Sequence, residues 1–195
     1  MGNVNFKRFH SATLIVKLSR ALKVVCCVGM LLGWMSCIDE SDGSASPQQG
    51  TIVHVGDALP AFEVVALDGS VWHRDSLLNH RSALIFFNSK CPDCQRTLPV
   101  VDSLYRSMSD TCDFRLLCIA REDGEATVKA YWAAQNFKMP VSPQTDRGIY
   151  ALFAHSGVPR IYLSNRKGTV CFMHDDQVLP TLQQLMEEVI ACGKQ

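Results

Sequence analysis

Two cysteines separated by two residues, Cys91 and Cys94, are the residues of this chain whose type and spacing most directly suggest chemistry. They follow an apolar run at 83–87 and open a stretch with helical periodicity, so Cys91 should lie where a helix begins. Unpaired backbone N–H groups and the helix dipole favour a thiolate at that position. Cys94, one helical turn later, would be placed to attack a mixed disulfide at Cys91. The pair therefore predicts thiol–disulfide exchange with Cys91 as the nucleophile.

The residues beside the pair set the charge and geometry of the first helical turn. Pro92 suits this turn because its missing N–H would be unpaired there in any case. Lys90 brings a positive charge that favours a thiolate at Cys91, whereas Asp93 brings a negative charge that opposes one. The two charges act against each other, so the sequence leaves the sign of the net pKa shift at Cys91 open.

The same pair is also compatible with a static disulfide or with half of a metal site. A zinc site would need a second ligand pair at matching spacing, and the remaining cysteines of the domain do not supply one. We therefore expect neither a metal nor another cofactor. Cys118 falls in an apolar segment and is expected to be an inert core thiol, whereas Cys112, Cys171 and Cys192 could include a structural disulfide whose partners stay open.

Segments of alternating type should position the pair. The apolar run 83–87 is typical of a central strand buried on both faces, and the spacing after it predicts a helix over 93–108 that Pro99 would kink. A turn signal at 68–70 predicts a β-hairpin over 62–72. Further strands are expected at 114–120, 160–163 and 169–173, and further helices at 125–137, 149–154 and 179–191. This order predicts an α/β fold with a central mixed sheet, helices on both faces and an N-terminal β-hairpin.

Length and composition are those of an ordinary globular protein. The 195 residues are 47% hydrophobic, and 19 Lys and Arg balance 19 Asp and Glu, so no global field attracts nucleic acid. One domain with a core of its own is expected over 51–195. Nucleic acid is accordingly not expected among its partners.

The N-terminal segment resembles an export signal. Basic residues from Lys7 to Lys23 precede an apolar run that is too short to span a membrane comfortably, so we expect a signal peptide at 1–36. A small residue before Cys37 resembles the cleavage site of bacterial lipoproteins, which would make Cys37 the lipidated N-terminus. Trp34 departs from that pattern, so cleavage by a general signal peptidase or retention as an anchor stays open. Residues 37–50 are polar and should form a flexible tether.

Several motifs together resemble a known family. They are Val55-Gly56-Asp57-x-x-Pro60-x-Phe62, Leu67-Asp68-Gly69, Phe86-Phe87 before the cysteine motif, Leu98-Pro99 and Gly157-Val158-Pro159. With them, 51–192 resembles the thioredoxin superfamily, especially the TlpA/ResA-like extracytoplasmic thiol:disulfide oxidoreductases. The resemblance implies a thioredoxin-like fold and exchange with client protein thiols and disulfides outside the cytoplasm. It also implies that Pro159 is a cis-proline against the cysteine pair and that the Val158 backbone pairs with a bound substrate chain.

The chain departs from this family where proton transfer is concerned. Lys90 stands where a tryptophan is usual, Thr97 where TlpA/ResA-like members often carry a glutamate, and Ile85 where thioredoxins bury an acid. Water together with Thr97 could serve Cys94 instead, the substrate could supply the base, or resolution could be slower than in the relatives. The redox direction is open for the same reason.

Two other functions are weighed against the oxidoreductase hypothesis. A thiol peroxidase of the related fold would want Thr-x-x-Cys, whereas this chain has Asn88 three residues before Cys91. A non-enzymatic module could hold copper or a partner through the two sulfurs and His155, although a solvated loop histidine is the plainer interpretation. Arg160 could guide acidic substrates past the site, but an exposed strand residue is the favoured interpretation.

Overall fold

The computed structural model describes residues 50–110 and 113–194. The predicted signal peptide at 1–36, the lipidation residue Cys37 and nearly all of the tether at 37–50 lie outside these ranges, as does Cys112. Within them, no helix is both long and apolar enough to cross a membrane.

A five-stranded mixed sheet carries the fold, with strand β3 (Arg81–Phe87) at its centre. On one side of β3 the parallel strands β4 (Phe114–Ala120) and β5 (Val141–Ser142) follow, and on the other side the antiparallel strands β6 (Arg160–Ser164) and β7 (Val170–His174). The side chains of β3 from position 82 to 87 are all buried, as the continuous apolar run predicted.

A separate two-stranded hairpin precedes the sheet. Strands β1 (Glu63–Val65) and β2 (Val71–His73) pair antiparallel, as expected from the turn signal between them. The carboxylate of Asp68 accepts hydrogen bonds from the backbone and the hydroxyl of Ser70, at 2.9 and 2.6 Å. Gly69 has φ +82°, a left-handed conformation that glycine adopts without the steric cost of a side chain.

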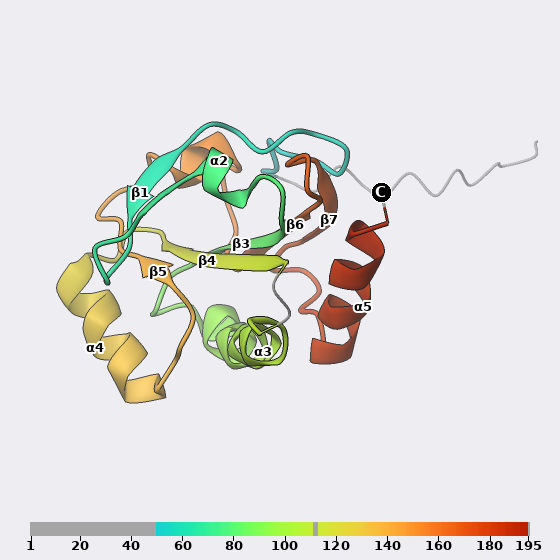
Figure 1. Ribbon diagram of the computed structural model, residues 1–195. Helices are drawn as coiled ribbons and strands as arrows, with labels where there is room; N and C mark the ends of the chain where they lie inside the picture. Colours follow the sequence, from blue (N-terminus) through green and yellow to red (C-terminus); the bar gives the residue numbers. More distant parts are fainter. Residues whose placement is uncertain (1–49, 111–112, 195) are drawn as a thin grey trace, which may run out of the picture. The chain divides into compact units, whose positions relative to one another are not determined.

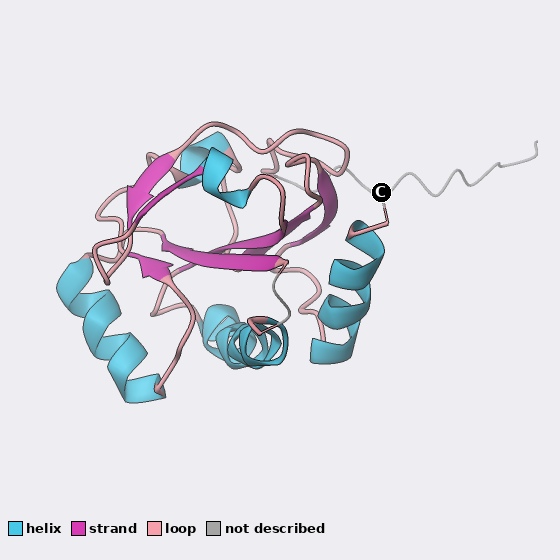
Figure 2. Ribbon diagram, viewed as in Figure 1, coloured by secondary structure: helices cyan, strands magenta, loops and turns pink. Residues whose placement is uncertain are grey.

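The sheet is covered on both faces (Figures 1 and 2). Helices α3 (Pro92–Met108), α4 (Glu125–Gln135) and α5 (Leu182–Cys192) lie on one face. The right-handed crossovers that join three successive parallel strands place α3 and α4 on the same side. The hairpin, the short helix α2 (Arg74–Leu77) and the 3-10 turn η1 (Tyr150–Leu152) cover the other face.

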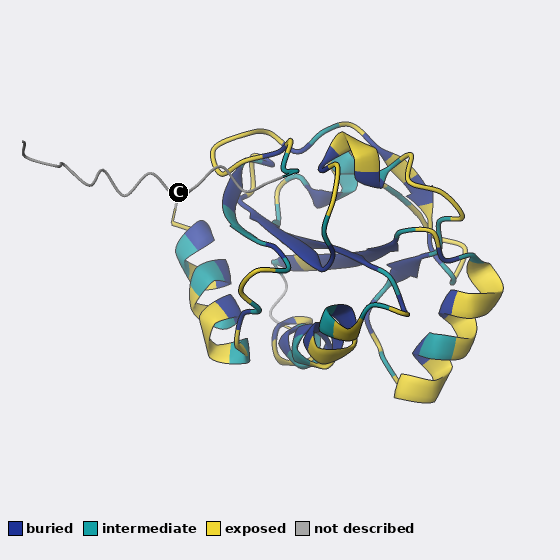
Figure 3. Ribbon diagram, turned by 180° about the vertical axis from the view of Figure 1, so that it is seen from behind, coloured by how far each residue is buried: buried dark blue, intermediate teal, exposed yellow. Residues whose placement is uncertain are grey.

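Adjacent phenylalanines of β3 show how the two faces are filled. Phe87 packs against Trp132 of α4 with ring centroids 5.0 Å apart, whereas Phe86 packs against Tyr150 and Phe153 on the opposite face at 5.6 and 4.8 Å. Successive strand residues point to opposite faces, so both layers of the core meet at this pair. Figure 3 shows the result, with the sheet buried and the outer side of α4 exposed.

The predicted fold class is confirmed, and the differences lie in short elements. The segment expected as a short helix at 149–154 forms only the single 3-10 turn η1. Helix α2 and strand β5, of four and two residues, had no counterpart in the prediction. Elements this short bury too few residues to produce a periodic pattern in the sequence.

A disulfide joins Cys171 of β7 to Cys192 at the end of α5, which settles two of the cysteines whose pairing was open. Both residues are buried. Residues Leu163 and Phe172 are register partners, so Cys171 lies at the end of β6 that is remote from Pro159. Cys91, Cys94 and Cys118 are free thiols.

Candidate active site

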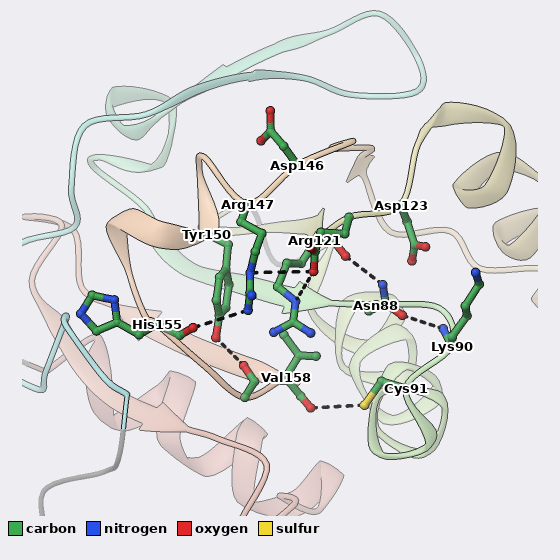
Figure 4. Close-up of polar contacts among 12 residues, drawn as sticks. Asn88, Lys90, Cys91, Arg121, Asp123, Asp146, Arg147, Tyr150, His155 and Val158 are labelled. Carbon is green, nitrogen blue, oxygen red and sulfur yellow. Dashed lines mark hydrogen bonds and ion pairs between the residues drawn. The ribbon is translucent and has the colours of Figure 1, made fainter.

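The loop between β3 and α3, residues 88–91, is held by hydrogen bonds within the loop and to residues that follow β4 (Figure 4). The amide of Asn88 donates to the carbonyl of Arg121 at 2.9 Å and accepts from the backbone N–H of Lys90 at 3.0 Å. The backbone N–H of Ser89 donates to the buried carboxylate of Asp123 at 2.6 Å. Arg121 directly follows β4 and Asp123 lies two residues further on, so segments at the carboxyl ends of two adjacent parallel strands are joined here.

Cys91 is the N-cap residue of α3 and is partly exposed. It has extended backbone angles, φ −78° and ψ 122°, and Pro92 follows at the first helical position, as expected. The thiol of Cys91 donates to the backbone carbonyl of Val158 at 3.3 Å. The Val158–Pro159 peptide bond is cis, as the resemblance implied. The structure thus places Val158 and Pro159 beside the exposed sulfur.

Cys94 is fully buried beneath Cys91, one turn along the helix. Burial raises the pKa of its thiol far above the ordinary value, and the neighbouring Cys91 sulfur acts in the same direction. A backbone hydrogen bond from Asn88 and the positive charge of Arg121 lower that pKa, but they do not offset the burial. The two sulfurs therefore differ in exposure, because Cys91 is accessible to solvent and Cys94 is not.

The residues that flank the cysteine pair were expected to influence the ionisation of its thiols, but the polar groups of Asp93 and Thr97 form bonds to other residues. The carboxylate of Asp93 forms an ion pair with Arg96 on the exposed side of α3, which partly neutralises the charge that was expected to oppose a thiolate. Thr97 is buried, and its hydroxyl donates to the carbonyl of Asp93 at 2.9 Å, a bond within the helix. Lys90 is exposed.

Three residues at the site were not identified from the sequence. The guanidinium of Arg121 lies 5.1 Å from the ring centroid of Tyr150, and that of Arg147 lies 5.6 Å from it. The hydroxyl of Tyr150 donates to the carbonyl of Gly157 at 2.6 Å, just before the cis-proline. Arg121 could have been noticed, since it directly follows the strand parallel to the one that leads into Cys91.

His155 does not join the cysteine pair. Figure 4 shows its ring pointing away from Cys91, on the far side of Tyr150. Its backbone N–H donates to Gly50 at 2.6 Å and its carbonyl accepts from Arg147 at 3.4 Å. Across residues 50–110 and 113–194, no group of three or more His, Cys, Asp or Glu side chains could hold a metal ion.

The expectation for Arg160 was wrong, because the residue is neither an exposed strand residue nor a guide for substrates. Its side chain is 1% exposed, and it donates to the carbonyl of Ser156 at 2.7 and 3.0 Å and to the hydroxyl of Thr51 at 2.7 Å. These acceptors offset the cost of burying the charge. Arg160 therefore ties the start of the domain to the loop before Pro159.

Replacement of Arg160 by methionine is expected to lower the free energy of unfolding by about 2 kcal/mol, because the buried guanidinium loses its hydrogen bonds to the carbonyl of Ser156 and the hydroxyl of Thr51. Urea unfolding monitored by circular dichroism measures the change. The exposed Arg96→Met variant is the control and should change the free energy of unfolding by no more than about 0.5 kcal/mol. Equal effects of the two substitutions would contradict the structural role of Arg160.

Comparisons with known proteins identify the fold. No protein-family model matches the chain, and no curated protein matches it. A candidate protein disulfide isomerase from Bacteroides thetaiotaomicron superposes with a TM-score of 0.70 at 23% identity, covering 75% of this chain and 94% of that one. A thioredoxin-family thiol:disulfide interchange protein from Chlorobium tepidum gives 0.62 at 20% identity, with coverages of 72% and 99%.

A third solved structure agrees with these two. A secreted disulfide oxidoreductase from Mycobacterium tuberculosis superposes with a TM-score of 0.59 at 18% identity, covering 67% of this chain and 95% of that one. The three likenesses establish a thioredoxin-like fold and confirm the fold that the motifs implied.

Proposed function

We propose that this protein is a thiol:disulfide oxidoreductase that exchanges disulfides with client proteins through Cys91 and Cys94. The observation that carries the proposal is the asymmetry of the two thiols, since Cys91 is partly exposed at a helix N-terminus and Cys94 is buried one turn later. An accessible sulfur can attack a client disulfide, and a protected neighbour can then resolve the mixed disulfide. Val158 and Pro159 form the proposed substrate platform beside Cys91, whose thiol donates to the Val158 carbonyl. Lys90, Pro92, Asp93 and Thr97 are its supporting residues.

The reaction proposed here proceeds in two exchanges. The thiolate of Cys91 attacks one sulfur of a client disulfide, which breaks the client S–S bond, forms a mixed disulfide and releases the other client sulfur as a thiolate. Cys94, once deprotonated, attacks the Cys91 sulfur, forms the Cys91–Cys94 disulfide and releases the second client thiolate. The client gains two electrons and two protons, and the pair on this protein loses them. The reverse sequence oxidises a dithiol client.

We further propose that the protein works outside the cytoplasm, in the cell envelope. A lipid attached to Cys37 would anchor it to the membrane. The sequence of 1–37 supports export and lipidation, and the upstream electron donor of the pair is unknown. The buried Cys171–Cys192 disulfide supports the same location, because such bonds persist in oxidising compartments. The fold neighbour from Mycobacterium tuberculosis is itself described as secreted.

A trapping experiment in cells tests client exchange. The full-length Cys94→Ser variant should accumulate mixed disulfides between Cys91 and its clients, because the resolving sulfur is absent. Clients recovered with the tagged protein under non-reducing conditions, and released by dithiothreitol, are identified by mass spectrometry. The double variant Cys91→Ser/Cys94→Ser is the matched control and should recover none. Recovery of the same proteins in equal amounts by both variants would remove the proposed exchange.

A further inference from the structure

Arg121 occupies an unusual position between the two loops that make the site. Its backbone N–H donates to Phe87 at the end of β3 at 2.7 Å, and its carbonyl accepts from the Asn88 side chain. Its own side chain is only 18% exposed. The guanidinium therefore lies next to the loop that leads into the cysteine pair, and Figure 4 shows it directed towards Val158, between the side chains of Tyr150 and Cys91 in this view.

The charge of Arg121 is only weakly compensated. Its Nε atom is buried and has no hydrogen-bond partner in the described part of the chain. The carboxylate of Glu122 lies 3.6 Å from that atom, but it also lies 3.8 Å from Nε of the more exposed Arg147. The single carboxylate of Glu122 is thus shared between two guanidinium groups and neutralises only part of their combined positive charge.

The aromatic ring of Tyr150 packs against this guanidinium. Tyr150 is in turn fixed to the carbonyl of Gly157. Glu122, the next residue, has φ +62°, a conformation that non-glycine residues adopt at a cost of about 1 kcal/mol or more. A strained turn directly after Arg121 is the kind of feature that functional sites retain.

The buried sulfur of Cys94 lacks a base at the two positions where the family resemblance would place one. Ile85 and Thr97 supply none, since the first is apolar and the hydroxyl of the second is bonded within its helix. The titratable or charged groups that interact with Cys94 include Cys91 at the N-cap of its own helix, Arg121 after β4 and Tyr131 on α4. Of these three, Arg121 is the one cation.

We propose that Arg121 is a positioning residue of the exchange reaction, whose guanidinium stabilises the thiolate of Cys94 while that sulfur attacks the mixed disulfide at Cys91. The proposal rests on the proposed function, because it concerns the second of the two exchanges. Arg121 takes no proton itself. It lowers the free energy of the anionic sulfur after the proton has left Cys94 for solvent, and the departing client thiolate takes up a proton in turn.

The direction of the pKa shift at Cys94 agrees with this role. Burial raises the pKa of the thiol, and the positive charge of Arg121 lowers it. Removal of that charge should raise the pKa of Cys94 further, so that a smaller fraction is thiolate at every pH below it. The resolving step should then be slower by a constant factor in that range, and its pH profile should shift to higher pH.

Stopped-flow reaction with 5,5′-dithiobis(2-nitrobenzoate) isolates the resolving step. The full-length chain is used with Cys26, Cys27, Cys37 and Cys112 replaced by serine in every variant, so that Cys91 is the accessible thiol and Cys94 is the thiol placed to resolve its mixed disulfide. Attack by Cys91 releases one thionitrobenzoate anion at a rate that depends on reagent concentration. Attack by Cys94 on the mixed disulfide releases the second at a rate that does not.

The Arg121→Gln variant is expected to slow the second release about tenfold between about pH 6 and 9, and to shift its pH profile upward by about one unit. Arg121→Lys keeps the charge and should recover most of the lost rate. Arg147→Gln is the matched control, because Arg147 stacks on the same ring but is far more exposed, and it should change the rate by less than about twofold.

Two results would overturn the role of Arg121 while leaving the proposed function intact. One is an Arg121→Gln variant with the wild-type rate and pH profile in the second phase. The other is an Arg121→Lys variant as slow as Arg121→Gln, which would indicate packing against Tyr150 instead of charge. A parent protein that shows no second phase at all would remove the proposed function itself, and the role of Arg121 with it.

Discussion

Replacement of Cys91 by serine is expected to reduce the turnover of a disulfide substrate to the background rate of the thiol reductant. The serine hydroxyl does not ionise near neutral pH, so the N-cap of α3 would carry no nucleophile. Cys94 cannot replace it, because its sulfur is fully buried and burial raises its pKa. Insulin reduction with dithiothreitol as electron donor, followed by turbidity, measures the loss.

Cys118 provides the matched control for this prediction. Its thiol is buried in β4, 3.7 Å from the sulfur of Met139, and burial raises its pKa well above the ordinary value, as expected of an inert core thiol. The Cys118→Ala variant should therefore keep its turnover within about twofold of the wild type. Turnover by the Cys91→Ser variant above about a tenth of the wild-type rate would show that another thiol carries the reaction.

The main elements of the fold could be predicted because their sequence patterns report burial directly. The continuous apolar runs that became β3 and β4 are buried on both faces, and a short run of this kind between polar segments is typical of a strand inside a parallel sheet. Strand β5 could not be predicted, because its two residues, Val141 and Ser142, are a strand only through pairing with the open edge of β4. Pairing between distant segments leaves no periodicity in the sequence.

The residues of the site likewise fall into those that could be predicted from the sequence and those that could not. Cys91, Cys94 and the cis-proline were predicted from short motifs, because the geometry of each motif depends on residues that are neighbours in the sequence. Arg160 was misjudged because a charged residue in a strand is usually exposed. The acceptors that make its burial tolerable include Thr51, which is 109 positions away in sequence. The position of Arg121 after β4 could have indicated that it lies near the site, but its contact with the ring of Tyr150 could not be predicted, because the two residues are distant in sequence.

Removal of the Cys171–Cys192 disulfide is expected to lower the free energy of unfolding by about 3 kcal/mol, the second large effect that the structure predicts. The bond closes a loop with a sequence separation of 21 residues, so breaking it releases the conformational entropy that the cross-link withholds from the unfolded chain. Urea unfolding of the Cys171→Ala/Cys192→Ala variant measures the change. The slope of the unfolding free energy with urea should also rise, because the unfolded chain without the link exposes more surface.

Two comparisons separate this effect from the loss of two buried sulfur atoms. The Cys118→Ala variant truncates one buried thiol that is not cross-linked, so it should leave the slope with urea unchanged. The disulfide also lies at the end of the sheet remote from Pro159, so its removal should leave the two phases of thionitrobenzoate release unchanged in conditions where the variant is folded. An unchanged slope together with altered release would instead mean that Cys171 and Cys192 take part in the exchange. The expected result makes the two pairs distinct in role, since one holds β7 to α5 and the other, at the far end of the sheet, does the chemistry.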